Sequence, residues 1–532
     1  MSVLKKEYHS YIYILGLLGL AVSLTLSLYV MSIAQFVLLA NWLLEGNLAY
    51  KLRSFFRNKP VLVFTGLYFL HLAGLFCTYD ISSALDELRI KLPLLALPLI
   101  ISTSTPLTNR TLNVVFLFHI AGTLISGLIS FYLFHTRNIT DIRDIFIFIS
   151  HIRYSLNVCV DIFILLYFIF YKNSFKVWMK FVFAAIVIWL VYFLFFMESF
   201  TGIAIVLLTS VAMAVLFVIK KASQAYKILF FTVLIVSFAG ASLYLHSVYK
   251  DLATSVPIDT SKLEQYTSHG NRYLHVKENK QKDNGNYTWL YVCDKELEEA
   301  WNKRSKIRYD SIDGKNSPVR FTIIRYLTSK GVKKDFEGLN SISSEEISYI
   351  EKGIANVNDI KKGNFKNRLR ILYWEFESYI ISNDPRGGTM TQRLELWKES
   401  LALYKNHFWL GIGTGDVKNV FAAKLVVDNS LLRGSGLRPH NQYLTFMIEF
   451  GIFGFLFFMF CLFYPALKQQ KMTDFLYASF FVIALLSMFT EDTLETQAGV
   501  TFFVFFSCLM LFLKKQEHPK KNSNFEIKIT NK

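Results

Sequence analysis

Long apolar runs, separated by short polar connectors, occupy most of the sequence. Most of these runs approach the roughly 20 consecutive apolar residues that an α-helix needs to cross a bilayer. The pattern predicts twelve membrane-spanning helices, or eleven if residues 10–45 form one bent helix. The expected crossings are 10–25, 27–45, 60–78, 91–105, 112–134, 155–171, 180–197, 201–219, 226–246, 441–466, 475–490 and 497–513.

The charge of the connectors alternates along the chain. Because Lys and Arg collect in the cytoplasmic loops of membrane proteins, we expect the basic connectors to be cytoplasmic and the acidic ones to lie outside. Both termini, including the basic tail 514–532, are then expected in the cytoplasm. The basic connectors are 51–59, 108–110, 171–180, 220–227 and 468–471, and the acidic ones are 79–87, 197–199 and 490–497.

One connector is far longer than the others. Residues 247–440 are polar and too long for a simple loop, so they predict a large, mostly helical extracytoplasmic domain before the tenth crossing. Residues 255–340 have no clear periodicity, but helical patterns run over 343–357, 366–381 and 391–408, the last with Leu394, Trp397, Leu401 and Tyr404 on one stripe. The predicted division is 1–246 with nine crossings, 247–440 as the outer domain, 441–513 with three crossings, and 514–532 as the tail.

Composition narrows the class of protein. Hydrophobic residues make up 53% of the 532 residues and charged residues only 18%, an apolar surface that a soluble protein cannot cover. The predicted fold class is therefore an all-α polytopic membrane protein. The net charge of +17 fits basic cytoplasmic connectors, so no nucleic-acid partner is expected. The five Cys residues are scattered and suggest neither a disulfide framework nor a metal site.

Short motifs gather near the start of the tenth crossing. Arg393 precedes Trp397 by one helical turn, so both are expected to project from one face. The alternating glycines that follow lack the strand and helix of a dinucleotide-binding unit, so that interpretation fails. In chain order the motifs are Arg393-x-x-x-Trp397, then Gly411-x-Gly413-x-Gly415, then His440-Asn441 followed after nine residues by Gly451-x-x-Gly454.

This order of motifs, entering a late membrane helix, resembles the O-antigen ligase and O-antigen polymerase superfamily of GT-C type membrane glycosyltransferases. Two earlier segments, HIRYS (151–155) and LRIKLPLLALPL (88–99), are similar to segments in many members. The insertion with EKGIAN (351–356) fits the ligase-like proteins of Bacteroidetes-type bacteria. One departure is Phe200, which stands in Ser-Phe-Thr-Gly where many members have Ser-Arg-Thr-Gly, so any role of that arginine is absent or supplied elsewhere.

The resemblance implies an activity and a location. It implies transfer of an undecaprenyl-diphosphate-linked glycan to lipid A–core at the periplasmic face of the bacterial inner membrane, with no metal or other cofactor. Polymerase activity on the lipid-linked glycan and protein O-oligosaccharyltransferase activity remain alternatives, because the acceptor is chosen by the shape of the cleft. A lipid-linked sugar flippase, from a different class, predicts internal repeats and polar mid-membrane segments, which the sequence lacks.

Such a transfer needs a base for the acceptor hydroxyl and cations for the diphosphate leaving group. His440 suits the first role, because imidazole accepts a proton near neutral pH. Arg393 suits the second, because a guanidinium pairs bidentately with phosphate oxygens. His440 as a helix cap and Arg393 as a snorkelling anchor are the structural alternatives. Further candidate contacts to the diphosphate or glycan are Arg153, Asn441, Arg143, Arg89, Lys91 and Arg438.

Overall fold

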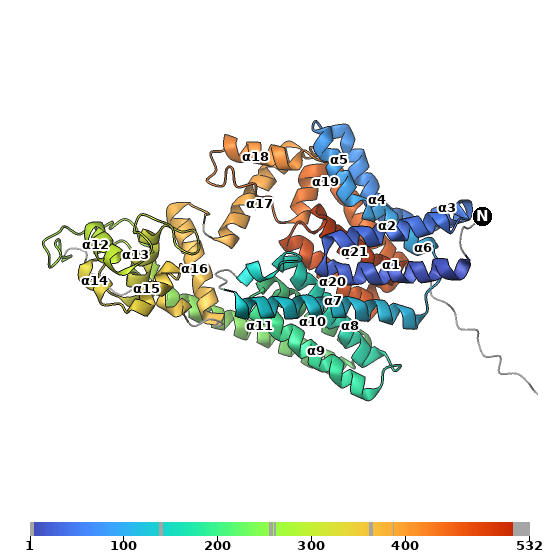
Figure 1. The fold of residues 1–532 in the computed structure, drawn as a ribbon, viewed down its shortest axis with the longest axis horizontal. Coiled ribbons are helices and arrows are strands. Elements are labelled where there is room, and N and C mark those ends of the chain that lie inside the picture. The colour runs from blue at the N-terminus through green and yellow to red at the C-terminus, as the bar shows by residue number, and fades with distance from the viewer. Residues whose placement is uncertain are drawn as a thin grey trace, which may run out of the picture.

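A computed structural model describes residues 5–137, 142–254, 259, 262–360, 365–386 and 388–513. Figure 1 shows a large bundle of long helices and a smaller helical domain to one side of it. The predicted all-α polytopic membrane fold is confirmed. The basic tail predicted at 514–532 lies outside the described residues.

Every expected crossing coincides with a helix of the bundle. Two further helices, α3 and α5, occupy connectors. In chain order the bundle contains α1 (Lys6–Leu26), α2 (Leu28–Leu44), α3 (Leu48–Arg57), α4 (Lys59–Gly74), α5 (Ile81–Lys91), α6 (Pro93–Thr103), α7 (Asn109–Thr136), α8 (His151–Tyr171), α9 (Val177–Phe196), α10 (Phe200–Lys221), α11 (Gln224–Ala253), α19 (Gln442–Lys468), α20 (Phe475–Thr490) and α21 (Gln497–Leu511). Short 3-10 turns occur at η1 (Leu75–Cys77), η2 (Ile142–Ile145), η4 (Lys471–Thr473) and η5 (Thr493–Glu495).

The lengths of these helices vary. Within the described residues, eight are long and apolar enough to cross a membrane, and the pair α2–α3, bent by 112°, would make a ninth. The expected crossing at 91–105 is the 11-residue α6. At 1.5 Å per residue it rises about 16 Å, roughly half of a bilayer's hydrocarbon core. Residues 10–45 form two helices, because Ser27 is extended and its Oγ accepts a hydrogen bond from Val30 N (3.3 Å).

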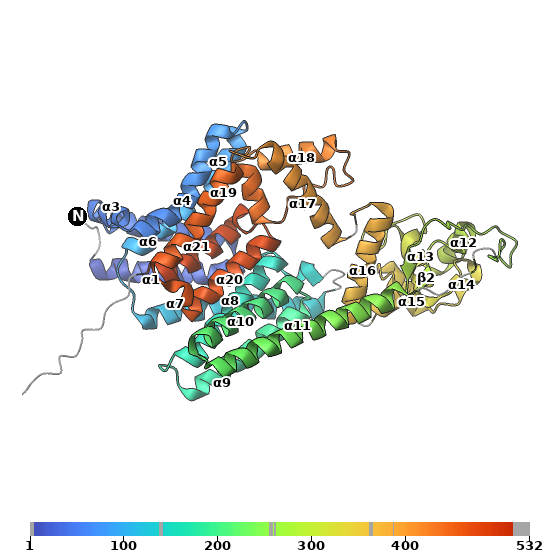
Figure 2. The same cartoon turned by 180° about the vertical axis from the view of Figure 1, so that it is seen from behind.

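The core of the bundle surrounds α21. Every side chain from Ala498 to Leu511 is buried, as expected for a helix that is apolar on all sides. The long helix α11 is also apolar, but of its side chains only Val248 is buried. It lies at the edge of the bundle and extends as far as the outer domain, as the reverse view in Figure 2 makes clear.

The outer domain has its own hydrophobic core, which includes Trp301, Tyr326 and Leu327. The section without clear periodicity forms three short helices and a hairpin whose register pairs Lys282 with Tyr287. The helix predicted from residue 343 begins after Ser343, which is its N-cap and forms a capping box with Glu346. The elements are β1 (Lys282–Asp283), β2 (Asn286–Tyr287), α12 (Asp294–Arg304), α13 (Val319–Lys330), α14 (Phe336–Asn340), α15 (Ser344–Glu351), η3 (Val357–Asp359), α16 (Phe365–Ser382), α17 (Thr389–Asn406) and α18 (Val417–Val427).

The helix predicted at 391–408 is α17, and its predicted apolar stripe is half packed, since Tyr404 is buried and Trp397 contacts Phe489. Leu394 and Leu401 are 43% and 46% exposed, whereas Leu396 and Leu403 are buried and pack toward α18 and α19. The buried stripe also carries polar residues, so apolar spacing alone predicts only part of it. The helix therefore packs across α19 with a face that overlaps the predicted stripe at Tyr404.

The glycine turn at 411–415 is a packing element. Gly411 has φ +74°, and a Cβ there would overlap the carbonyl of Glu449. Opposite it, Gly451 breaks α19 with φ +62°, and a Cβ there would overlap the carbonyl of Trp409. The turn supplies the N–H of Ile412 to the carbonyl of Ile448 (3.0 Å), which the break leaves without its helical partner. The break and the turn thus fix the start of α19 against α17.

Candidate active site

The loop between α20 and α21, residues 491–496, lies at the centre of the candidate site. From sequence it was predicted only as an acidic outer connector. Arg393 of α17 reaches this loop, since its Nη1 donates to the carbonyl of Thr490 (2.6 Å) and its Nη2 lies 3.3 Å from Glu491 Oε1. Trp397, one turn later, contacts Phe489 and donates to the carbonyl of Pro439 (2.9 Å). The prediction that Arg393 and Trp397 share one face is confirmed.

The same loop holds the His440 side chain. His440 Nδ1 lies 3.5 Å from Glu491 Oε2, and the His440 side chain is 32% exposed. Glu491 therefore stands between the two residues predicted to carry the chemistry, with one carboxylate oxygen toward Arg393 and the other toward His440. Because the imidazole faces Glu491 through Nδ1, its Nε2 is left for a molecule that enters from outside.

Asp492 holds the backbone around His440. Its carboxylate accepts hydrogen bonds from the backbone N–H of His440 (3.2 Å) and of Asn441 (3.0 Å) and from the hydroxyl of Thr445 (2.9 Å). His440 has φ +51°, a conformation uncommon for a residue with a side chain. The carboxylate therefore stabilises a strained backbone that orients the imidazole.

Asn441 is the N-cap of α19. Its Oδ1 accepts hydrogen bonds from the N–H groups of Tyr443 (3.0 Å) and Leu444 (3.2 Å), and its side chain is buried. Its predicted roles, fixing His440 or binding a sugar, stay predictions, because these contacts make it a helix cap. It satisfies two N–H donors that every helix start leaves open.

Two of the predicted cations lie in a buried ionic cluster. Lys91, fully buried at the end of α5, contacts Glu495 (2.8 Å), Glu87 (3.4 Å) and the carbonyl of Leu494 (2.5 Å). Arg438 spans the same two carboxylates, 3.3 Å from Glu87 and 3.7 Å from Glu495. Burial opposes ionisation of Glu495, but Lys91, the largest of the opposing influences, keeps its pKa below the ordinary value. This cluster holds α5 to the acidic loop.

Arg153 differs from the other predicted arginines. It lies in the first turn of α8, beside Gly499 of α21 and within electrostatic range of Glu491 and Asp492. Among the described residues, its guanidinium forms no hydrogen bond or ion pair of contact distance. It is therefore a cation near the loop whose donors remain for a ligand.

The remaining predicted contacts lie elsewhere. Arg89 is 76% exposed and pairs with Asp86 on α5, and Arg143 is exposed on η2. Phe200, at the position of the family's usual arginine, begins α10 and is 36% exposed. The structure therefore brings together Arg393, His440, Asn441, Arg153, Lys91 and Arg438, and leaves Arg89 and Arg143 outside this group.

The carboxylates of the loop titrate differently. Burial, followed by repulsion from Glu495, raises the pKa of Asp492 from 3.8 to about 6. Burial also acts against the charge of Glu491, but the adjacent His440 and the positive charges of Arg393 and Arg153 hold the pKa of Glu491 below the ordinary value. Glu491 is thus ionised when the adjacent imidazole accepts a proton.

Sequence reasoning missed Glu491, Asp492, Glu495 and Glu87 as site residues. The sequence did contain a signal for the loop residues, because the acidic connector 490–497 was expected on the same side of the membrane as Arg393 and His440.

Inside the helix bundle, the sequence analysis also missed two His–carboxylate pairs, His71–Glu449 (3.1 Å) and His119–Asp161 (3.4 Å). No group of three or more His, Cys, Asp or Glu side chains that could hold a metal ion occurs in the described ranges.

Comparison with known proteins supports the predicted resemblance to O-antigen ligases. Residues 341–459 match the family model described as O-antigen ligase, a family of glycosyltransferase-like ligases. The match runs from α15 to the middle of α19, so it includes Arg393, the glycine turn and His440, but not the acidic loop or Arg153. No curated protein matches the chain. The match at residues 341–459, together with the polytopic helical bundle, supports the predicted resemblance to the O-antigen ligase superfamily.

Proposed function

We propose that the protein transfers a glycan from undecaprenyl diphosphate to a hydroxyl of lipid A–core at the periplasmic face of the inner membrane. The family match supports ligase-type glycosyl transfer. The observation that carries the proposed site is the position of Glu491 between His440 and Arg393. A carboxylate, an imidazole and a guanidinium meet there beside a partly exposed surface.

In the proposed reaction His440 Nε2 accepts the proton of the acceptor hydroxyl. The hydroxyl oxygen forms a bond to the anomeric carbon of the glycan as the bond from that carbon to the diphosphate oxygen breaks. The lipid diphosphate leaves with the bonding electron pair, and His440 later releases its proton to solvent. Glu491 orients the imidazole through Nδ1 and stabilises the imidazolium. Such positioned base catalysis contributes about 10²–10⁴-fold.

The two arginines have different proposed roles. Arg393 is held by Thr490 and Glu491 and is only 18% exposed, so it positions Glu491 and offers one edge to the substrate. Arg153 is the proposed diphosphate contact, because its guanidinium forms no ion pair of contact distance in the described part of the chain. A guanidinium stabilises the charge that develops on the leaving diphosphate.

The periplasmic location rests on the charges of the connectors. α19 begins beside His440 and ends at Lys468, and α4 begins at Lys59. The basic connectors 51–59 and 468–471 therefore lie at the end of the bundle away from His440. The positive-inside rule makes that end cytoplasmic, which supports a periplasmic site.

A deletion strain complemented with variants tests the proposal. Without the protein, surface glycan is lost and the full-length lipid-linked polymer accumulates. H440A and R393A should reproduce this loss while reaching the membrane at the normal level, whereas R89Q, an exposed cation outside the site, should restore the glycan. Accumulation of single repeat units would instead indicate a polymerase. Full activity of both H440A and R393A would refute the site.

A further inference from the structure

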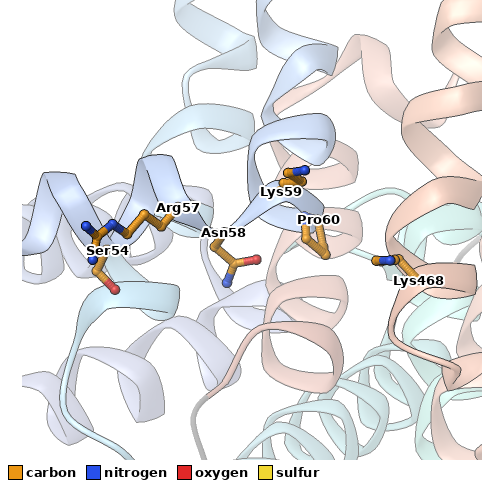
Figure 3. A pocket seen from close by; sticks show the side chains of 6 residues that line it. All are labelled: Ser54, Arg57, Asn58, Lys59, Pro60 and Lys468. Atoms are coloured by element: carbon orange, nitrogen blue, oxygen red, sulfur yellow. The ribbon is translucent and has the colours of Figure 1, made fainter.

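A pocket lies at the opposite end of the bundle from His440. Its volume is about 440 Å³, in the range of small-ligand sites. Figure 3 shows its lining side chains where α3, α4 and α19 meet. They are Ser54, Arg57, Asn58, Lys59, Pro60 and Lys468. Because α19 carries His440 next to its start and Lys468 at its end, this pocket and the candidate active site are separated by the whole helix.

The three cations of this pocket have no acidic partner among the residues that the structure describes. Arg57, Lys59 and Lys468 come from three helices, and in the described residues no carboxylate forms an ion pair with any of them. The nearby Lys51 is different, because it is buried and pairs with Glu45 at 2.8 Å. Like charges that line one pocket repel each other, and an anion bound there reduces that repulsion. The arrangement therefore indicates an anionic ligand.

The helix α3 indicates where this ligand resides. It is bent by 112° from α2, and Leu48, Leu52 and Phe56 form an exposed apolar stripe along it at four-residue spacing. Arg53 and Arg57, also four residues apart, form the adjoining stripe. An amphipathic helix of this kind lies in the membrane interface, with its apolar side toward the acyl chains and its cations at the level of the phosphates.

We propose that this pocket binds the phosphate headgroup of an anionic phospholipid. The Arg57 guanidinium can pair with two phosphate oxygens, and the ammonium groups of Lys59 and Lys468 supply further charge. Apolar side chains continue from the pocket along the lipid-facing surface, since Phe56 is 64% and Leu467 is 61% exposed. A soluble anion has no use for that apolar continuation, whereas the acyl chains of a lipid cover it. A lipid in this position ties α3 to the packed pair α4 and α19.

Lipid titration of the purified full-length protein tests this proposal. Phosphatidylglycerol is added to the protein in detergent, and bound lipid is counted by native mass spectrometry, with phosphatidylcholine as the neutral lipid. The test variant is R57Q/K59Q/K468Q. The matched control is K176Q/K220Q/K221Q, which removes three exposed cations near the corresponding ends of α9 and α10 but none of the pocket.

We expect the pocket variant to bind phosphatidylglycerol at least tenfold more weakly than the unmodified protein, because each basic side chain near a lipid phosphate contributes roughly fivefold in affinity. The control should bind within about twofold of the unmodified protein, since its cations lie outside the pocket. Equal binding by the pocket variant, or equal binding of phosphatidylcholine by the unmodified protein, would overturn the proposal. Displacement of the lipid by equimolar inorganic phosphate would assign the pocket to a free anion and also overturn it.

A single substitution avoids the risk that the triple variant fails to fold. Lys468 is exposed at the end of its helix, so K468Q leaves the packing unchanged. It should weaken phosphatidylglycerol binding several-fold and reduce the thermal stabilisation that this lipid confers, with glycan transfer unchanged in detergent. If K468Q binds and is stabilised by the lipid as the unmodified protein is, the pocket is not the lipid site.

Discussion

His440 and Glu491 face each other at the mouth of the bundle, with Nδ1 of the imidazole 3.5 Å from Oε2 of the carboxylate. They come from different parts of the chain, one just before α19 and the other just after α20. The second oxygen of Glu491 lies 3.3 Å from Arg393. The three side chains therefore form one unit, in which a substitution of any member changes the contacts and the electrostatic environment of the others.

Glu491→Gln should lower the rate of glycan transfer by about 10²-fold, because it keeps the shape of the side chain but removes the charge that stabilises the imidazolium. Residues that act as a unit are not additive. H440A/E491Q should therefore be no slower than H440A alone. The measurement is transfer in vitro with purified protein and a lipid-linked donor. Independent, multiplying losses in the double variant would contradict coupling between the two residues.

Asp492 should make stability fall as pH rises. Its pKa is raised from 3.8 to about 6, so the folded protein holds the proton more tightly than the unfolded chain does. The resulting stability is fully present below pH 4 and is lost as pH rises through 6, by at most about 3 kcal/mol. Asp492→Asn removes this titration. We expect the stability of the unmodified protein relative to D492N to decrease between pH 4 and pH 7, measured by thermal unfolding. A difference that stays constant with pH would show that Asp492 does not titrate there.

Lys91→Met should destabilise the protein by about 3–5 kcal/mol, because it removes the ammonium group that the buried Glu495 and the partly buried Glu87 share. K91M/E495Q should recover much of the loss, since one of those charges is then removed as well. Thermal unfolding of the three purified proteins measures this. Arg89→Met, two residues earlier but exposed, serves as the control and should change stability little. Equal effects of K91M and R89M would mean that the buried cluster contributes nothing.

Gly451→Ala should disturb the candidate site from a distance. The new Cβ would overlap the carbonyl of Trp409, so α19 must shift relative to α17. The alanine would also have to hold φ +62°, which is strained for a residue with a side chain. Gly46→Ala is the matched control, because Gly46 has φ +76° but no neighbour within 4 Å. G46A should lower the free energy of unfolding by only about 1 kcal/mol, the cost of the left-handed backbone conformation. G451A should cost more and reduce transfer, and similar losses for both variants would rule out the steric effect.

The sequence by itself determined the positions of the apolar helices, the start of a helix at Ser343 and the shared face of Arg393 and Trp397. Each of these depends on neighbouring residues: an apolar run long enough for a bilayer, an N-cap before its helix, or a spacing of one helical turn. The family motif was readable for the same reason, because its residues follow one another closely along the chain.

Tertiary structure alone decided which face of α17 is buried, and that Glu491 and Asp492 hold His440. The face depends on how α17 meets α18 and α19, and the buried side includes polar residues that a pattern of apolar spacing does not select. Glu491 reaches His440 only because α19 and α20 pack with those ends together. Such contacts join segments far apart in sequence, so the physical cause lies in the packing of whole helices rather than in any local pattern.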